Sequence, residues 1–303
     1  MINTKLAYIE PKSISKVSTV LSLIITVIGV IISLIAIGLI VSALPQLNTY
    51  ISTNISAFII IGIIIGLILS LVLNYVVVYI NALLYNYLLK YFKGIQFELT
   101  PYNEIKEIDI LPTLTMEMII MAIWFIFAEI VLILTFSIVI SLISSASNIF
   151  GNINVATLTA NSLTVVTLVT LISWVFMSIL MFIAMFIFNF FTRRNPLKLD
   201  IVENDILELK SIDVISYVMS VGFTLLTIQL IRTLINIMVS GSMEVALLNI
   251  VNTIAICIVF TAVMPFLYNI ISSKMGGIRF NIEPSSNMIQ EYNITNNSDD
   301  YDM

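Results

Sequence analysis

The sequence predicts an all-α membrane protein with six transmembrane helices. These form three tandem helical hairpins with pseudo-threefold symmetry and a small cytoplasmic β-sheet as a cap. The first observation is composition: 59 % of the 303 residues are apolar and 10 % are charged, whereas about 25 % are charged in ordinary soluble domains. The second is a set of six apolar stretches that exceed the roughly 20 residues needed to cross a bilayer. The third is the recurrence of short motifs between these stretches.

The six apolar stretches define the predicted spans in chain order. They cover residues 17–43, 55–89, 114–143, 163–191, 214–239 and 245–271. The second and fourth are long enough to tilt or to project beyond the membrane. The first is too long for the apolar part of a signal peptide and lacks a small-residue cleavage site. We therefore expect it to be a true span.

The distribution of Lys and Arg predicts the orientation. Twelve of the 13 positive residues lie before the first span, between the second and third, between the fourth and fifth, or after the sixth. The other connecting segments, 42–54, 144–162 and 240–244, contain none. Positive residues stay in the cytoplasm because crossing opposes the membrane potential and the attraction of anionic lipids. We expect a multi-pass protein of the cell membrane with both termini in the cytoplasm.

Short segments on the predicted cytoplasmic side resemble one another. Before the first, third and fifth spans, an isoleucine is followed by an acid and then by a hydroxyl residue where a helix should begin. The acids are Glu10, Asp109 and Asp213. Oxygen-bearing side chains suit a helix start, whose first N–H groups lack partners. Near the ends of the second, fourth and sixth spans, an aromatic residue precedes an asparagine, which we expect to form hydrogen bonds at a helix end or to the sheet. These are Asn86, Asn189 and Asn269.

The recurrence divides the chain into hairpin units 1–104, 105–204 and 205–283, followed by an acidic, Asn-rich tail at 284–303 that we expect to be disordered. Each unit is predicted to run strand, helix, outer loop, helix, strand. Gly94 and Gly277 are expected to provide turns between helix and strand. The six short strands should form one small cytoplasmic sheet, with the first strand pairing with the last to close it. The alternative is a set of extended linkers lying on the lipid surface.

Two of these motifs resemble a known family. The segment Ile9-Glu-Pro-Lys-Ser13 before a hairpin, and Tyr268-Asn269 with Gly276-Gly-Ile278 after one, are similar to the DUF3566 family of small transmembrane domains. The resemblance implies three tandem copies that cover nearly the whole chain. The first copy has Lys93-Gly94 in place of the glycine pair, and the second departs further, with Arg194-Asn-Pro196. The family has no established activity, so the resemblance implies an architecture without a mechanism.

Ionisable residues are scarce deep inside the predicted spans, where a charge costs about 2.5–3.5 kcal/mol unless it is paired or hydrated. Glu129 lies near the middle of the third span and Arg232 in the outer half of the fifth. We predict an intramembrane polar cluster of Glu129, Gln229, Arg232, Asn236, Asn249 and Asn252. One interpretation is an ion or proton site. The other, which we favour because a Glu–Arg pair neutralises itself, is a clasp that fixes the helix register.

Two further groups of residues are assigned to the membrane. Seven basic residues follow the second, fourth and sixth spans and are expected to contact lipid headgroups; a specific lipid or phosphate ligand is the alternative. They are Lys90, Lys93, Arg193, Arg194, Lys198, Lys274 and Arg279. Gly62, Gly66 and Ser70 form a small-residue face for close helix packing on the second span. Aromatic residues at the cytoplasmic helix ends, including Tyr85 and Tyr87, predict an interfacial belt.

The composition does not indicate an enzyme. The sequence has no histidine and one cysteine, Cys257, which excludes a His-ligated haem, a His- or Cys-built zinc site and a histidine-based catalytic triad. No cofactor or metal is expected. The isoelectric point near 4.7, with acids interspersed among the bases, argues against a nucleic-acid partner.

The favoured function is a non-enzymatic structural or accessory subunit of a membrane complex. Its expected partners are the lipid bilayer and either another membrane protein or a second copy of the chain. The alternative is a channel or transporter that uses the polar cluster around Glu129 and Arg232. A pore on the threefold axis is not expected, because polar positions in the first, third and fifth spans do not recur at matching offsets.

Overall fold

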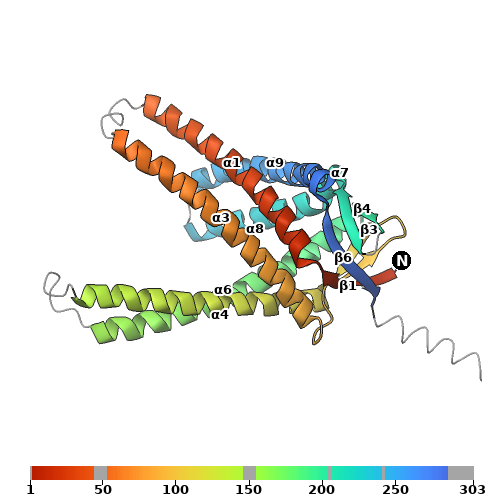
Figure 1. Ribbon diagram of the computed structural model, residues 1–303, viewed down its shortest axis with the longest axis horizontal. Coiled ribbons are helices and arrows are strands. Elements are labelled where there is room, and N and C mark those ends of the chain that lie inside the picture. Colours follow the sequence, from red (N-terminus) through yellow and green to blue (C-terminus); the bar gives the residue numbers. More distant parts are fainter. Residues whose placement is uncertain (1, 44–52, 146–154, 204–205, 241–242, 286–303) are drawn as a thin grey trace, which may run out of the picture.

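A computed structural model describes residues 2–43, 53–145, 155–203, 206–240 and 243–285 (Figure 1). The predicted tail from residue 286 onward and most of the predicted outer loops lie outside the described residues. The helices are α1 (Pro11–Ala43), α3 (Thr53–Leu88), α4 (Ile110–Ser145), α6 (Val155–Thr192), α7 (Val214–Tyr217), the π-helical turn η1 (Val218–Gly222), α8 (Phe223–Ser240) and α9 (Met243–Met275). The strands are β1 (Ile2–Ile9), β2 (Gln96–Leu99), β3 (Glu104–Asp109), β4 (Leu197–Val202), β5 (Leu207–Ile212) and β6 (Ile278–Pro284).

The predicted fold class is wrong, because the strands are not a small cap sheet on an all-α protein. They close into a six-stranded antiparallel barrel in the order β1-β2-β3-β4-β5-β6, and β6 pairs back onto β1. Closure gives every strand two neighbours and leaves no free edge. The predicted pairing of the first strand with the last is confirmed, through pairs as distant in sequence as Thr4 and Pro284.

The predicted number of spans also requires correction. Among the described residues, five helices are long and apolar enough to cross a membrane: Pro11–Ala36, Ile61–Leu88, Ile110–Val139, Thr164–Thr192 and Val214–Leu234. The predicted sixth span, 245–271, lies within α9. This segment is not among the five helices found in the described residues. The five apolar helices fit a membrane protein.

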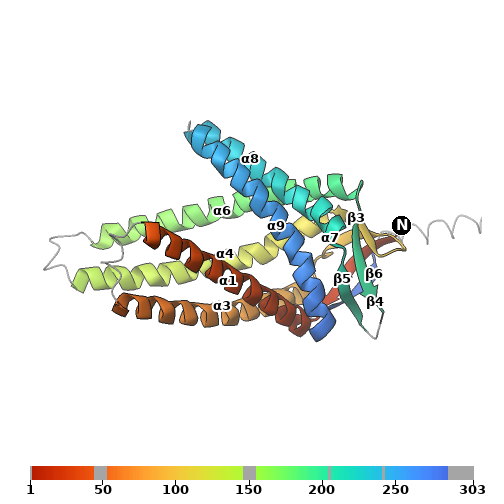
Figure 2. The ribbon, with the colours of Figure 1, turned by 90° about the horizontal axis from the view of Figure 1, so that it is seen from above.

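The long helices form three hairpins that project from one end of the barrel. α1 packs along α3, α4 along α6, and α8 along α9. Figures 1 and 2 show the hairpins diverging as they leave the barrel. Buried apolar residues gather where helices meet strands, in one cluster around Tyr268 and Ile271 and another around Tyr85 and Met116. The hydrophobic core of the described chain is therefore concentrated at this junction.

Three asparagines fix the second helix of each hairpin to the strand that precedes that hairpin. The pairs are Asn86 with Ile9, Asn189 with Ile108, and Asn269 with Ile212. Each isoleucine donates its N–H to the asparagine Oδ1, at 3.0, 2.9 and 2.8 Å, and accepts from Nδ2 at 2.7, 2.8 and 2.9 Å. A primary amide carries a donor and an acceptor side by side, so it satisfies both backbone groups of one residue. The predicted contact of these asparagines with the sheet is confirmed.

Tyrosine hydroxyls add a second link in the first and third hairpins. Tyr85 donates to the carbonyl of Leu6 at 2.7 Å and accepts from the N–H of Ile95 at 3.1 Å. Tyr268 makes the equivalent two bonds between α9, β5 and β6. In the second hairpin this position is Phe188, which has no hydroxyl. The middle hairpin therefore lacks this link and depends more on its asparagine.

Glycines permit the tight passage from helix to strand after the first and third hairpins. Gly94 and Gly276 have positive φ angles of 77° and 84°, which side chains disfavour. Gly277 is needed for another reason: a β-carbon there would lie 1.8 Å from the carbonyl oxygen of Leu209. The turn role predicted for Gly94 is confirmed, whereas Gly277 allows β5 and β6 to approach.

Hydroxyl side chains near the helix starts join successive hairpins into a ring. Each accepts a hydrogen bond from a backbone N–H in the last strand of the preceding hairpin. The pairs are Thr113 with Gln96 (3.2 Å), Ser216 with Lys198 (3.0 Å), and Ser13 with Arg279 (2.9 Å). The last pair connects the third hairpin to the first, so it reinforces barrel closure.

We predict that Asn189→Ala destabilises the protein by about 2 kcal/mol, because two hydrogen bonds worth about 1 kcal/mol each are lost and the Ile108 backbone is left unpaired. Thermal unfolding in detergent measures the effect as a lower Tm. Asn195→Ala, at an exposed position near the same helix end, is the control. Equal Tm values for the two variants would contradict the role of the asparagine.

Candidate functional site

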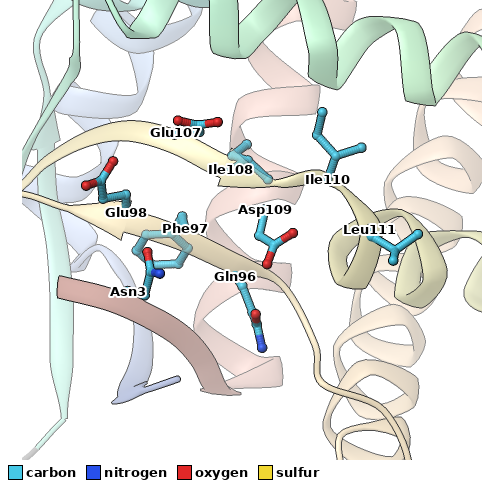
Figure 3. Close-up of a pocket in the computed structure, with 9 residues that line it drawn as sticks. All are labelled: Asn3, Gln96, Phe97, Glu98, Glu107, Ile108, Asp109, Ile110 and Leu111. Atoms are coloured by element: carbon cyan, nitrogen blue, oxygen red, sulfur yellow. The ribbon is translucent and has the colours of Figure 1, made fainter. Parts of the chain in front are cut away.

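The outer face of the barrel carries a recess of about 580 Å³ over β2 and β3 (Figure 3). Its lining residues are Asn3, Gln96, Phe97, Glu98, Glu107, Ile108, Asp109, Ile110 and Leu111. Glu98 and Glu107 are direct partners across the two strands. Like charges in this position repel each other, so the recess needs a nearby cation.

Arg193, directly after α6, supplies that cation. Its Nε donates to one carboxylate oxygen of Glu107 at 3.1 Å, and a terminal nitrogen donates to the other. This is the bidentate geometry that arginine favours with carboxylates. The hydrogen bonds to Glu107 raise the pKa of Arg193 above its usual value, and the charge of Glu98 adds to the effect. Arg193 therefore stays charged and offsets the acidity of the recess.

The recess is lined by both carboxylates and apolar side chains. Within the described residues, no group of three or more His, Cys, Asp or Glu side chains is arranged to hold a metal ion. Leu111, at the edge of the recess in the first turn of α4, is 75 % exposed, and Ile215 in α7 is 74 % exposed. The recess thus combines carboxylates with an exposed apolar side chain next to the helix starts.

The seven basic residues predicted to contact lipid headgroups are all exposed. Lys274 lies in the last turn of α9, and the others lie between the hairpins and the barrel strands or near the start of β4 and β6. Three of them form ion pairs with carboxylates of the barrel strands or of the residue between β1 and α1. Arg193 pairs with Glu107, Lys198 with Glu104 at 3.9 Å, and Arg279 with Glu208 and Glu10 at 3.6 and 3.9 Å. Exposed ion pairs of this kind contribute little to stability, because water and salt screen the charges. These three cations are partly engaged within the protein.

Two others lie over aromatic rings. Lys90 is 5.6 Å from the ring centre of Tyr87, and the guanidinium of Arg194 is 4.7 Å from that of Phe190. Both rings are at least half exposed. An aromatic ring with a cation at a helix end is typical of a membrane interface. Lys93 and Lys274 form no ion pair within the described part of the chain. Headgroup contact by all seven stays a prediction.

Within the predicted polar cluster, the structure gives Glu129 a partner on its own hairpin. The hydroxyl of Thr167 on α6 donates to Oε1 of Glu129 at 2.6 Å. Arg232 on α8 is exposed, and among the described residues it forms no ion pair with Glu129. The structure therefore does not bring the two charges together.

The remaining cluster residues lie on α8 and α9. Gln229 is partly exposed on α8, one turn before Arg232. Asn236, Asn249 and Asn252 are helical, but their side chains lie outside the described part of the structure. The cluster as a whole stays a prediction.

The small-residue face of α3 is open in the structure. Gly62, Gly66 and Ser70 are all exposed. A β-carbon added at either glycine would meet no atom of the described chain within 4 Å. No described helix uses this face, so close packing there would require another molecule and stays a prediction.

Several polar contacts between helices were not predicted from the sequence. Trp124 on α4 donates its indole N–H to Oδ1 of Asn81 on α3, which links the first and second hairpins. Trp174 on α6 donates to the carbonyl of Met118 at 3.2 Å. Tyr85, assigned to the aromatic belt, is only 3 % exposed and bridges two strands instead. Isolated Asn, Thr and Trp residues within the apolar stretches could have indicated these contacts, because their polar groups need hydrogen-bond partners in a membrane.

Comparison with known proteins gives no relative: no protein-family model matches the chain, and no curated protein or solved structure matches it. The resemblance to the DUF3566 family is therefore a prediction that rests on the quoted motifs. Any function must be argued from the geometry of this chain.

We predict a coupling free energy of about 1 kcal/mol between Glu129 and Thr167 in a double-mutant cycle of Glu129→Gln and Thr167→Val, because their side chains share a hydrogen bond. The free energies of unfolding in detergent provide the measurement. A parallel cycle of Glu129→Gln with Arg232→Met should give a coupling near zero. Strong coupling to Arg232 with none to Thr167 would contradict the described geometry and favour the predicted clasp.

Proposed function

We propose that this chain is a non-enzymatic structural or accessory subunit of a complex in the cell membrane. The supporting observation is the exposure of apolar side chains along the hairpins. Leu39 on α1 and Ile172 on α6, for example, are each 66 % exposed. Contiguous apolar surface of this extent is unfavourable in water and marks contact with lipid or with other membrane proteins. Because the hairpins diverge, their lateral faces are available to both.

The proposed orientation places the barrel and both termini in the cytoplasm. β1 precedes the first hairpin and β6 follows the last, and the two strands pair in one barrel. The segments on either side of the hairpins must therefore lie on the same side of the membrane. Lys and Arg residues are concentrated in these flanking segments. By the positive-inside rule, this supports a cytoplasmic barrel.

We further propose that the chain consists of three tandem units with a common origin, as the DUF3566 resemblance implies. The triple occurrence of the asparagine contact supports this proposal, as do the hydroxyl contacts between successive hairpins. In this arrangement each hairpin anchors two strands of the barrel. The anchors would hold the barrel, with its acidic recess, at a fixed height above the membrane.

A partner subunit would find two kinds of surface on such a protein. The hairpins offer apolar helix faces inside the membrane, including the open face of Gly62 and Gly66. The barrel offers the recess of Glu98 and Glu107 with the exposed Leu111 at its edge. The channel alternative has less support, because Glu129 is engaged by Thr167 on its own hairpin.

The test is purification of the full chain in mild detergent, with its molecular mass and co-purifying proteins identified by mass spectrometry. We expect a stable oligomer or a defined partner. Ion flux in liposomes containing the purified protein should equal that of empty liposomes. A monomer without any partner would contradict the proposal. Ion flux would contradict it too, if Glu129→Gln abolishes that flux and the control variant Ser137→Ala on the same helix preserves it.

A further inference from the structure

The inside of the barrel holds a space that is lined by apolar side chains. Side chains at alternating strand positions point inward, as a pleated strand requires. They include Phe97 and Leu99 from β2, Leu199 and Ile201 from β4, and Phe280 and Ile282 from β6. The remaining lining residues come from β1, β3, β6 and the first turns of α1, and all of them are Leu or Ile. No polar side chain lines this space, which we call the lumen.

The lumen is not filled by its own side chains. A cavity of about 220 Å³ remains between them, although an eight-stranded barrel is already narrow enough for side chains to fill. All the lining residues keep partial exposure, in contrast to Met116 and Tyr268 at the helix junction, which are 0 % and 5 % exposed. An apolar concave surface that stays accessible inside a closed barrel is a place for a ligand.

The chemistry of the lining defines the ligand. A buried water needs two to four polar partners, and a wholly apolar cavity of about 150 Å³ stays dry and binds benzene or xenon. The lumen is larger and equally apolar. We propose that the lumen binds a compact hydrocarbon group, which gains contact with the lining side chains and removes apolar surface from water.

Two sources could supply such a group, one at each end of the barrel. At the helix end, Ile9 and Ile14 belong to the lining, so the acyl chain of a neighbouring lipid is one source. At the far end, Ile201 and Ile282 also line a polar recess that includes Asn103 and Glu203. A free small apolar molecule would enter from that side. Both sources present the same chemistry to the lumen.

The experiment uses the full chain in lipid nanodiscs with 4-fluorophenylalanine incorporated at Phe280, and ¹⁹F NMR as the readout. Xenon under pressure is the probe for a small apolar molecule. A phosphatidylcholine spin-labelled at the end of its acyl chain is the probe for a lipid. The matched control carries the fluorine at Phe186, which is 64 % exposed on α6 within an apolar helix.

For a small apolar molecule, we expect xenon to shift the Phe280 signal saturably and several-fold more than the Phe186 signal. Ile201→Phe, which fills the lumen, should abolish the shift. If that variant does not fold, Ile282→Phe replaces it. For a lipid chain, we expect the spin label to broaden the Phe280 signal as it broadens the Phe186 signal.

Either response supports the proposal and identifies the source. No response to xenon or to the spin label at Phe280 would overturn it. A response that appears only after residues 286–303 are deleted would overturn it as well, because the chain itself would then occupy the lumen. These outcomes are independent of whether the protein co-purifies with a partner.

Discussion

The pairing of the first strand with the last is the constraint on which the rest of the structure depends. β1 and β6 are separated by nearly the whole described chain, yet five pairs of residues are in register between them. This pairing closes the barrel, and each of the three hairpins connects two neighbouring antiparallel strands, so all three leave from and return to the same end of it. The asparagine and hydroxyl contacts then fix each hairpin to its strands at that end. Divergent helices, a concentrated core and a hollow barrel all follow from this arrangement.

Local features of the fold and the pairing of the first strand with the last could be predicted from the sequence, whereas the place of the barrel as the main structural element could not. The order strand–helix–helix–strand follows from the periodicity of apolar residues and from the length of the apolar stretches. The contact of Asn86, Asn189 and Asn269 with strands follows from the recurrence of these residues at helix ends. The register of the six strands depends on how they pair in space, which alternation does not encode. A sheet that pairs its first and last strands was expected, but as a minor cap on an all-α protein. The observed barrel is instead the element to which every hairpin is attached.

Prediction of the candidate site from the sequence is limited in the same way, because the sequence does not specify spatial partners. The sequence singles out Glu129 as an ionisable residue in an apolar stretch, and its hydrogen-bond partner in the structure is Thr167 on the adjacent helix. A lone charge in the sequence indicates the need for a partner without specifying which one. Tyr85 illustrates the opposite case: an aromatic residue at a helix end fits both an interfacial belt and a buried bridge. Burial of 97 % of its surface, which only the fold reveals, decides for the bridge.

The most direct measurement of barrel closure is disulfide formation between cysteines placed on β1 and β6. In a Cys257→Ser background, Lys5→Cys with Glu283→Cys joins two residues that are partners across these strands. Tyr8→Cys with Glu283→Cys, whose first position is the partner of Asn281 instead, is the out-of-register control. The account predicts efficient intramolecular disulfide formation for the first pair and little for the second in membranes under mild oxidation. Failure of the first pair, or equal yield for both, would contradict the closed barrel.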